Sequence, residues 1–374
     1  MYFSPKTSAD GLVFHYDTGN TVSSYLGEPT VNLLYSAGAT NLTNGAGDIY
    51  GRCTKTDLGN GKYRFVNNGT GVSTVRVYTN QGDLVNGATY ACSVYYENLV
   101  GGIGIDWCDT GITGLNYSTN VSGRLGGYGT RATYDGPYYF LDINFDSGGA
   151  VTLYNPQVEY KSHVTPFVAG TRSATQGLKD LTAANTINLS NVSFDANAQM
   201  TFDGSNDYIS LADGTKWFTN EWTYEMVLKF NGNTGTYQGL LWGEGDTGGG
   251  SGLQKLFTFY NYSYFHYRIN NAVTGWAYTD FTPTGFTPTK YNHLVWQFNN
   301  GVTNLYISGA LAHTNNVRGA YSGGTNSPLY IGCRNDVAYV FNGEMPMLKR
   351  YSRALTADEV TRNYNAIKSR FNIG

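Results

Sequence analysis

The sequence predicts an all-β protein with two antiparallel β-sandwich domains and one α-helix at the C-terminal end. Aromatic residues make up 15% of the 374 residues and charged residues only 14%, with 48 glycines. This composition excludes a coiled coil and a charged disordered chain. Short alternations of apolar and polar residues, separated by clusters of Gly, Asn, Asp and Thr, are typical of antiparallel sandwiches. The length is too great for one ordinary domain.

The clearest strand prediction covers residues 222–230. Trp222 and the even-numbered residues after it are apolar, whereas Glu221, Glu225 and Lys229 occupy odd positions and are expected on the opposite face. A shift of one residue would bury those charges, so the register is well specified. The same reasoning predicts strands at 62–67, 88–97, 137–145, 151–160, 199–203, 207–211, 255–260, 264–269, 292–299, 303–308, 328–332 and 338–342.

The one predicted helix begins after Thr356. Thr356 and Glu359 form a capping-box pattern, in which each side chain binds the backbone amide of the other residue. Val360, Tyr364, Ile367 and Phe371 recur at helical spacing and form one apolar face. We expect this face to dock on the second sandwich.

Composition places domain boundaries near residues 28 and 170. Gly27–Thr30 is a turn cluster, and residues 155–173 run from a strand into an extended stretch interrupted by proline. Residues 1–8 are expected to form an N-terminal arm that attaches to a neighbouring protein. No repeat with a period of 20–50 residues is visible in the sequence, which disfavours a propeller or a solenoid.

The net charge and the lengths of the apolar stretches limit the classes of binding partner. A net charge of -3 and the lack of Lys or Arg runs disfavour nucleic-acid binding. No stretch reaches the roughly 18 apolar residues of a membrane helix, and the first ten residues do not have the pattern of a secretory signal. The cysteines Cys53, Cys92, Cys108 and Cys333 include no C-x-x-C pair. We expect buried free thiols, with a Cys92–Cys108 disulfide as the alternative.

A series of motifs runs from about residue 175 to 370. In chain order they are residues 202–209 (FDGSNDYI), 221–225 (EWTYE), 293–296 (HLVW), 305–309 (LYISG), 329–333 (LYIGC), 341–345 (FNGEM) and 351–360 (YSRALTADEV). The segment resembles the concanavalin A-like jelly-roll family, in the laminin G-like form frequent in bacteriophage virion proteins. The resemblance implies two packed antiparallel sheets.

The N-terminal residues resemble the opening strand of the same family. The matching stretches are residues 11–20 (GLVFHYDTGN) and 24–27 (SYLG), and relatives continue almost directly into a stretch like residues 177–182 (GLKDLT). The resemblance therefore implies a discontinuous jelly roll made of residues 9–28 and 174–374. Residues 30–170 are then an inserted domain, which a surface turn tolerates when the two ends of the insert lie close together.

The inserted segment resembles the β-sandwich carbohydrate-binding-like modules of phage tail and fibre proteins. The matching residues are 32–34 (NLL), 151–160 (VTLYNPQVEY) and 165–167 (TPF). Neither this resemblance nor the jelly-roll resemblance specifies a chemical reaction.

The residues that would catalyse glycoside hydrolysis are not evident. That reaction requires two carboxylates facing one cleft, about 5–5.5 Å apart in retaining enzymes. Glu244 and Asp246 have no third acid near them, and Glu221 and Glu225 lie about 13 Å apart along a strand. His293, beside an apolar strand, is most simply a structural histidine. We therefore expect a protein that is not an enzyme.

Calcium is the one metal ion that the sequence suggests, and no cofactor is required. Asp203, Asn206 and Asp207 in a tight turn could supply the oxygen ligands that Ca²⁺ prefers, with Asp246 as a weaker candidate. The alternative is that these residues simply suit the turn.

Glycan binding would require aromatic rings beside polar side chains, since a flat ring packs on a pyranose while polar groups bind its hydroxyls. The candidates are Trp107, Tyr117, Tyr128 and Tyr134 in loop-rich parts of the inserted segment, and Trp276, Tyr278 and Tyr262 in the second sandwich. For each of them the alternative is a core or intersubunit contact.

The leading hypothesis is a bacteriophage virion structural protein, either a capsid decoration or a head-fibre or tail-fibre component. Assembly in the host cytoplasm would explain an exposed protein without a secretion signal. We expect a homo-oligomer, a trimer, bound to other virion proteins and able to bind host-surface polysaccharide. The alternatives are a glycan-binding adhesin or lectin proper and a polysaccharide-degrading glycoside hydrolase.

Overall fold

The structure is a computed structural model that describes residues 7–36, 53–78, 84–106, 113–115, 117–131, 139–212, 217–234, 236–243, 255–271, 275–316, 328–334 and 336–373. The chain divides into two compact units. Unit 1 comprises Met1–Glu28 and Ala174–Gly374, and unit 2 comprises Pro29–Ser173. Within the described ranges, no helix has both the length and the apolar character needed to cross a membrane.

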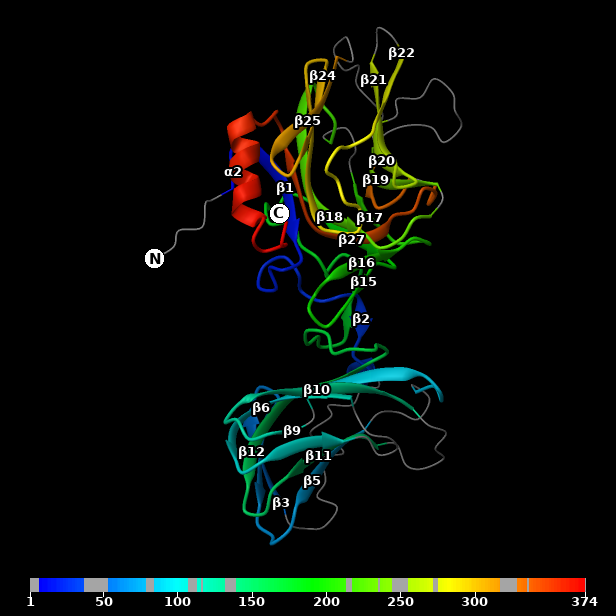
Figure 1. Cartoon of the computed structure of the whole chain (residues 1–374). Helices are drawn as coiled ribbons and strands as arrows, with labels where there is room; N and C mark the ends of the chain where they lie inside the picture. Colours follow the sequence, from blue (N-terminus) through cyan, green and yellow to red (C-terminus); the bar gives the residue numbers. More distant parts are fainter. Residues whose placement is uncertain are drawn as a thin grey trace. The chain divides into compact units, whose positions relative to one another are not determined.

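Unit 1 contains two large antiparallel sheets (Figure 1). The first is ordered β15 (Ser193–Phe194), β16 (Met200–Asp203), β27 (Asn342–Tyr351), β18 (Glu221–Phe230), β23 (Asn292–Asn299), β24 (Val302–Ile307) and β25 (Ala310–Asn316), with β1 (Leu12–Asp17) also paired to β27. The second is ordered β14 (Ile187–Ser190), β17 (Tyr208–Leu211), β26 (Leu329–Ile331), β19 (Tyr237–Gly243), β20 (Lys255–Tyr260), β21 (Tyr264–Asn271) and β22 (Gly275–Phe281).

The main core of unit 1 is rich in aromatic side chains from both sheets. The even-numbered residues of β18, from Trp222 to Phe230, are all buried in it, which confirms the predicted alternation. Trp296 of β23 stacks on Phe257 of β20 with ring centroids 5.0 Å apart. The aromatic-rich composition therefore fills the space between two sheets, and the all-β prediction is confirmed.

The helix α2 (Ala357–Ile367) begins where the sequence predicts. Thr356 accepts a hydrogen bond from the Glu359 amide at 3.2 Å, and Glu359 accepts one from the Thr356 amide at 2.9 Å. The helix packs on the face of the eight-stranded sheet that is turned away from the main core, with Val360 against Val295 and Ile367 against Val227. Figure 1 shows α2 in red beside β1 in blue.

The strand alternation of β18 predicts a solvated odd-numbered face, and that prediction is wrong for Glu225. Glu225 occupies the odd-numbered face of β18 as expected, but its side chain is 0% exposed instead of solvated. The helix covers this face, and Asn363 of α2 donates a hydrogen bond to the Glu225 carboxylate at 2.6 Å. The alternation of a strand cannot show that a distant helix covers its polar face.

The predicted strand at 338–342 is also misplaced, because the strand is β27, which starts at Asn342 and runs to Tyr351. Pro346 lies within it, and proline is normally excluded from central strands since it lacks an amide donor. Here β16 pairs with residues 342–344 and β1 with residues 347–351. Pro346 therefore lies in the gap between two partners, where no ladder donor is required.

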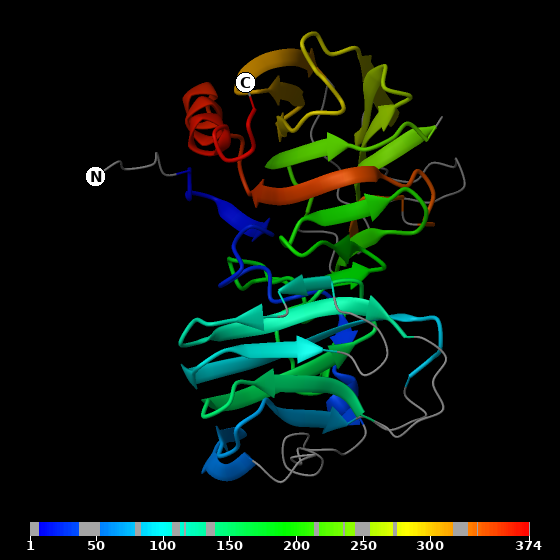
Figure 2. The ribbon, with the colours of Figure 1, turned by 60° about the horizontal axis from the view of Figure 1, so that its bottom comes forward.

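Unit 2 is a separate β-structure, and Figure 2 shows its strands. It has its own hydrophobic core. Its six-stranded sheet is ordered β3 (Cys53–Gly59), β4 (Lys62–Asn67), β12 (Ala150–Glu159), β6 (Thr89–Val100), β10 (Gly123–Thr130) and β8 (Thr113–Leu115). A four-stranded sheet is ordered β5 (Ser73–Tyr78), β11 (Tyr139–Phe145), β7 (Ile103–Asp106) and β9 (Tyr117–Ser118). A one-turn helix, α1 (Leu33–Ser36), was not predicted.

The two ends of unit 2 lie together. Short strands β2 (Thr30–Val31) and β13 (Thr171–Arg172) pair with each other in antiparallel fashion. Adjacent ends are the geometry that allows one domain to be inserted into a turn of another.

Residues 1–6 of the expected arm lie outside the described residues. Ser8 is buried against α2, where its amide donates to Asn363 at 2.8 Å and its hydroxyl to Glu359 at 2.9 Å. Cys92 and Cys333 are buried in unit 2 and unit 1, and burial raises the pKa of Cys333 to about 12. Cys108 lies outside the described residues, so the alternative of a Cys92–Cys108 disulfide stays a prediction.

Candidate functional site

The residues considered as calcium ligands form the turn between β16 and β17. Asp207 accepts a hydrogen bond from the Asp203 amide at 2.8 Å, and Asp203 accepts one from the Ser205 amide at 2.7 Å. Burial raises the pKa of Asp207 to about 6, whereas Asn206 is exposed. Two carboxylates therefore stabilise the turn itself. The described part of the chain contains no group of three His, Cys, Asp or Glu side chains placed to hold a metal ion.

The acids considered for hydrolysis do not form a pair among the described residues. Glu225 is buried beneath α2, whereas Glu221 is half-buried and accepts a hydrogen bond from Asn300 at 2.8 Å. Glu244 and Asp246 are outside the described residues. His293 is fully buried, with Nε2 3.3 Å from Glu225 Oε1.

The predicted glycan-binding aromatics are dispersed. Trp107 and Tyr134 lie outside the described residues. Trp276 and Tyr278 are in β22, where their backbone partners in β21 are Asn270 and Arg268. In unit 2, Tyr128 of β10 is 38% exposed and Tyr117 of β9 is 56% exposed. Among the candidates that the structure describes, Tyr117 lines a pocket.

The Tyr117 pocket has a volume of about 320 Å³. Its lining combines aromatic, hydroxyl, amide and guanidinium groups and consists of Tyr96, Tyr117, Ser118, Thr119, Asn120, Ser122, Gly123 and Arg124. Tyr96 donates a hydrogen bond to Ser118 Oγ at 2.7 Å, and the Asn120 amide donates to the same oxygen at 3.1 Å. The loop between β9 and β10 is thus held in place beside the exposed ring.

Two glycines keep this pocket open. A Cβ at Gly102 would lie 2.3 Å from the Tyr117 hydroxyl, and one at Gly123 would lie 2.9 Å from the Tyr96 hydroxyl. Contacts below 3.0 Å force a neighbour to move. Side chains at these positions would therefore displace the rings that line the pocket.

Arg124 contributes to the wall of the pocket, but its guanidinium lies on the face of the sheet that carries Tyr95, opposite the face of Tyr96. Its guanidinium donates to Ser93 Oγ at 2.7 Å and to the Thr165 carbonyl at 2.8 Å, and it lies 4.8 Å from the centre of the Tyr95 ring. Burial lowers the pKa of Arg124, but an arginine keeps its charge at neutral pH. These contacts hold the guanidinium on the Tyr95 face of the sheet, so the polar side chains beside the Tyr117 ring are those of Ser118 and the loop that follows it.

The other concentration of tyrosines lies on the second sheet of unit 1, on the face opposite its core. Tyr237 is 4.6 Å from Tyr260 and 5.4 Å from Tyr339, measured between ring centroids, and Tyr208 is 5.8 Å from Tyr330. All are half-buried because the rings pack on one another. Tyr262, in the adjoining turn, is half-buried and packs against the core. These rings offer less free surface than Tyr117.

Sequence reasoning identified Tyr117 but missed its polar neighbours. Ser118, Asn120 and Ser122 follow it directly, so the polar run after an aromatic residue was a usable signal. The sequence around Gly102 and Arg124 gave no indication of a role in the pocket, because that role depends on how strands pair across unit 2.

Residues 203–361 match a family model described as the concanavalin A-like lectin/glucanases superfamily. The match lies within unit 1, which therefore contains a concanavalin A-like, laminin G-like jelly-roll domain. A search of curated proteins gave no match.

Similar solved structures share little sequence with this chain. A mutant of Trypanosoma rangeli sialidase displaying trans-sialidase activity is 15% identical, with a TM-score of 0.41 over 52% of this chain and 31% of that one. The receptor binding domain of botulinum neurotoxin C/D mosaic serotype is 13% identical, with a TM-score of 0.40 over 50% and 48%. The botulinum neurotoxin serotype D ligand binding domain in complex with N-acetylneuraminic acid is 12% identical, with a TM-score of 0.40 over 52% and 49%.

This chain therefore spans less than half of each of these structures. The family match, and not these structures, is the basis for the domain assignment.

Proposed function

We propose that the protein is a non-enzymatic bacteriophage virion component whose β-sandwich units are displayed on the particle, and that unit 2 binds host-surface glycan at the Tyr117 pocket. The observation that carries the glycan proposal is the exposed Tyr117 ring beside a set of polar side chains that contacts within unit 2 hold in place.

The pocket has the two components that a sugar requires. The ring of Tyr117 offers a flat apolar surface for one face of a pyranose. Ser118, Asn120 and Ser122 can donate hydrogen bonds to the hydroxyl oxygens of a sugar. Because Ser118 is already held by hydrogen bonds from Tyr96 and from the Asn120 backbone amide, little conformational entropy is lost on binding.

The display role is supported by the sequence more than by any single contact. The chain has few charges, and the motifs between residues 202 and 360 resemble those of the laminin G-like domains of phage virion proteins. A non-enzymatic role is supported by Glu225, whose carboxylate is used for internal hydrogen bonds. Labelled antibodies against the chain should decorate purified phage particles, and light scattering should give the mass of a trimer. Particles that do not bind the antibodies would contradict the location in the virion. The mass of a monomer in light scattering would contradict the trimer.

A glycan array and a pull-down with host envelope test the binding proposal. Wild-type chain should bind a defined set of glycans, and Tyr117→Ala should weaken that binding about tenfold or more, since base or sugar stacking on an aromatic ring contributes on the order of 1–3 kcal/mol. Gly123→Leu should block the pocket without removing any polar group. Tyr128→Ala is the matched control, because Tyr128 is exposed in the same unit but does not line the pocket.

The alternatives predict other results. A structural component that binds no glycan would give no signal on the array, and an adhesin or lectin proper would bind glycan but be absent from particles. A glycoside hydrolase would release reducing sugar from host polysaccharide, and Glu244→Gln would abolish that release.

A further inference from the structure

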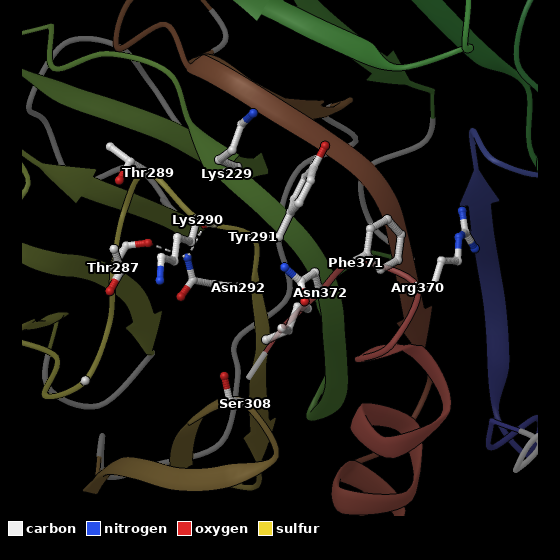
Figure 3. Close-up of a pocket in the computed structure, with 12 residues that line it drawn as sticks. Lys229, Thr287, Thr289, Lys290, Tyr291, Asn292, Ser308, Arg370, Phe371 and Asn372 are labelled. Carbon is white, nitrogen blue, oxygen red and sulfur yellow. Dashed lines mark hydrogen bonds between the residues drawn. The ribbon is translucent and has the colours of Figure 1, made fainter.

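We infer that unit 1 carries a second ligand site, for a carboxylate-bearing sugar, in the pocket between the segment after α2 and the loop before β23 (Figure 3). Its volume is about 710 Å³, within the range of ligand pockets. The inference does not rest on the Tyr117 proposal, since the two pockets share no residue.

The lining is positively charged. Three of the lining residues, Lys229, Lys290 and Arg370, are basic, and none is acidic. Lys229 pairs with Glu344 at 2.7 Å, and Arg370 pairs with Asp17 at 2.6 Å. The charges of these two cations are therefore largely neutralised by the carboxylates of Glu344 and Asp17.

Lys290 supplies the positive charge that is left over. It is exposed, and its ammonium group has no hydrogen bond or ion pair with any residue that the structure describes. An ammonium group in this position is available to pair with an anionic group of a ligand. The charge of the pocket therefore favours an acidic ligand over a neutral one.

Two aromatic rings favour a sugar over a simple anion. Tyr291 and Phe371 are half-buried, with ring centroids 5.6 Å apart and an interplanar angle of 57°. Figure 3 shows Lys290 and Arg370 on opposite sides of this pair. The surrounding groups are hydroxyls and an amide, from Thr287, Thr289, Ser308 and Asn372. A carboxylated pyranose would match all three types of surface.

The loop wall of the pocket is held before any ligand arrives. Asn292 Nδ2 donates to the carbonyls of Thr287 at 2.9 Å and Lys290 at 2.6 Å. The Phe230 amide donates to the Pro288 carbonyl at 2.9 Å, which joins the loop to β18. The backbone around Lys290 is therefore preorganised.

The C-terminal wall is also held. The Ile373 amide donates to the Lys368 carbonyl at 2.9 Å. The Ile373 side chain is buried against Val227 and Met347 of the sheet. Binding would consequently order few groups, which preserves affinity.

The test is calorimetric titration of the full chain at low salt with a short oligosaccharide containing glucuronate. The matched probe is the same oligosaccharide with its carboxyl groups reduced to alcohols. The chain also carries Tyr117→Ala, so that binding at unit 2 does not contribute. We expect the acidic probe to bind about tenfold more tightly than the reduced one, as for a charge-assisted contact.

Lys290→Gln should remove this tenfold preference and leave the affinity for the reduced probe unchanged. Lys179→Gln, at another exposed lysine of unit 1, makes the same change in net charge outside the pocket and should have no effect. Phe371→Ala should weaken both probes equally, since it removes ring surface and no charge.

Three results would overturn the inference. Equal binding of the two probes would show that the carboxylate is not recognised. Equal losses from Lys290→Gln and Lys179→Gln would show that only net charge matters. Competition by acetate or inorganic phosphate at the affinity of the sugar would show a simple anion site. None of these three results tests the proposed glycan site at Tyr117. That proposal fails if the glycan array shows no binding or no effect of Tyr117→Ala.

Discussion

Replacing Glu225 by glutamine should destabilise unit 1 severely, although the two side chains have the same shape. The carboxylate is fully buried and contacts Lys349 Nζ at 3.3 Å, His293 Nε2 at 3.3 Å, Tyr351 OH at 3.1 Å and Asn363 Nδ2 at 2.6 Å. Burial alone would raise the pKa of Glu225, but Lys349, His293 and Asn363 outweigh it and hold that pKa well below its ordinary value. The folded state therefore depends on the charge.

The expected loss is about 3–5 kcal/mol, the usual cost of removing one partner of a buried ion pair. Glutamine leaves the buried ammonium of Lys349 without a counter-charge. In a domain of this size each kcal/mol shifts the unfolding midpoint by about 2–4 °C, so we expect a decrease of roughly 6–20 °C. The loss should be smaller in the double variant Glu225→Leu with Lys349→Met, which removes both charges together.

Thermal unfolding followed by tryptophan fluorescence is a suitable assay, because every tryptophan except Trp107 lies in unit 1. Glu221→Gln is the matched control. It makes the same chemical change on the same strand at a half-buried position, and it should cost no more than about 0.5 kcal/mol. If Glu225→Gln and Glu221→Gln unfold at the same temperature, the buried charge contributes nothing and the reasoning is refuted.

Two further predictions concern pH and the helix cap. Burial, with a contribution from Lys349, lowers the pKa of His15 from 6.5 to about 4, so the unfolded chain binds the proton more readily. The free energy of unfolding should fall as pH falls from 6.5 to 4, and His15→Gln should reduce that slope in denaturant titrations at several pH values; an unchanged slope would contradict this. Thr356→Ala should cost about 1 kcal/mol in the same titrations by removing the cap of α2, whereas Thr356→Ser should retain stability; equal losses would show that the cap is not the cause.

The parts of the fold that could be predicted are those encoded by local periodicity. The alternation from Trp222 to Phe230 defines which face of β18 enters the main core, and Thr356 with Glu359 defines where α2 begins. In both cases the interacting groups are only a few residues apart, so the chain pattern contains the information.

The errors arise where distant segments meet. Nothing near Pro346 shows that two strands pair with β27 on either side of it and leave a gap. Likewise, Tyr117 could be selected as an exposed aromatic residue, but the pocket also depends on Gly102, in the turn between β6 and β7, and on Gly123 of β10. Pairing between strands far apart in the chain decides both arrangements.

The sequence by itself determined an aromatic-rich, charge-poor all-β protein with a single long helix at its end. The tertiary structure decided which of its few charges are solvated. Glu225 is buried because α2 covers the outer face of its sheet, whereas Lys290 is exposed beside the segment that follows the same helix. The environment of a charge depends on what packs over it, and strand periodicity does not encode that.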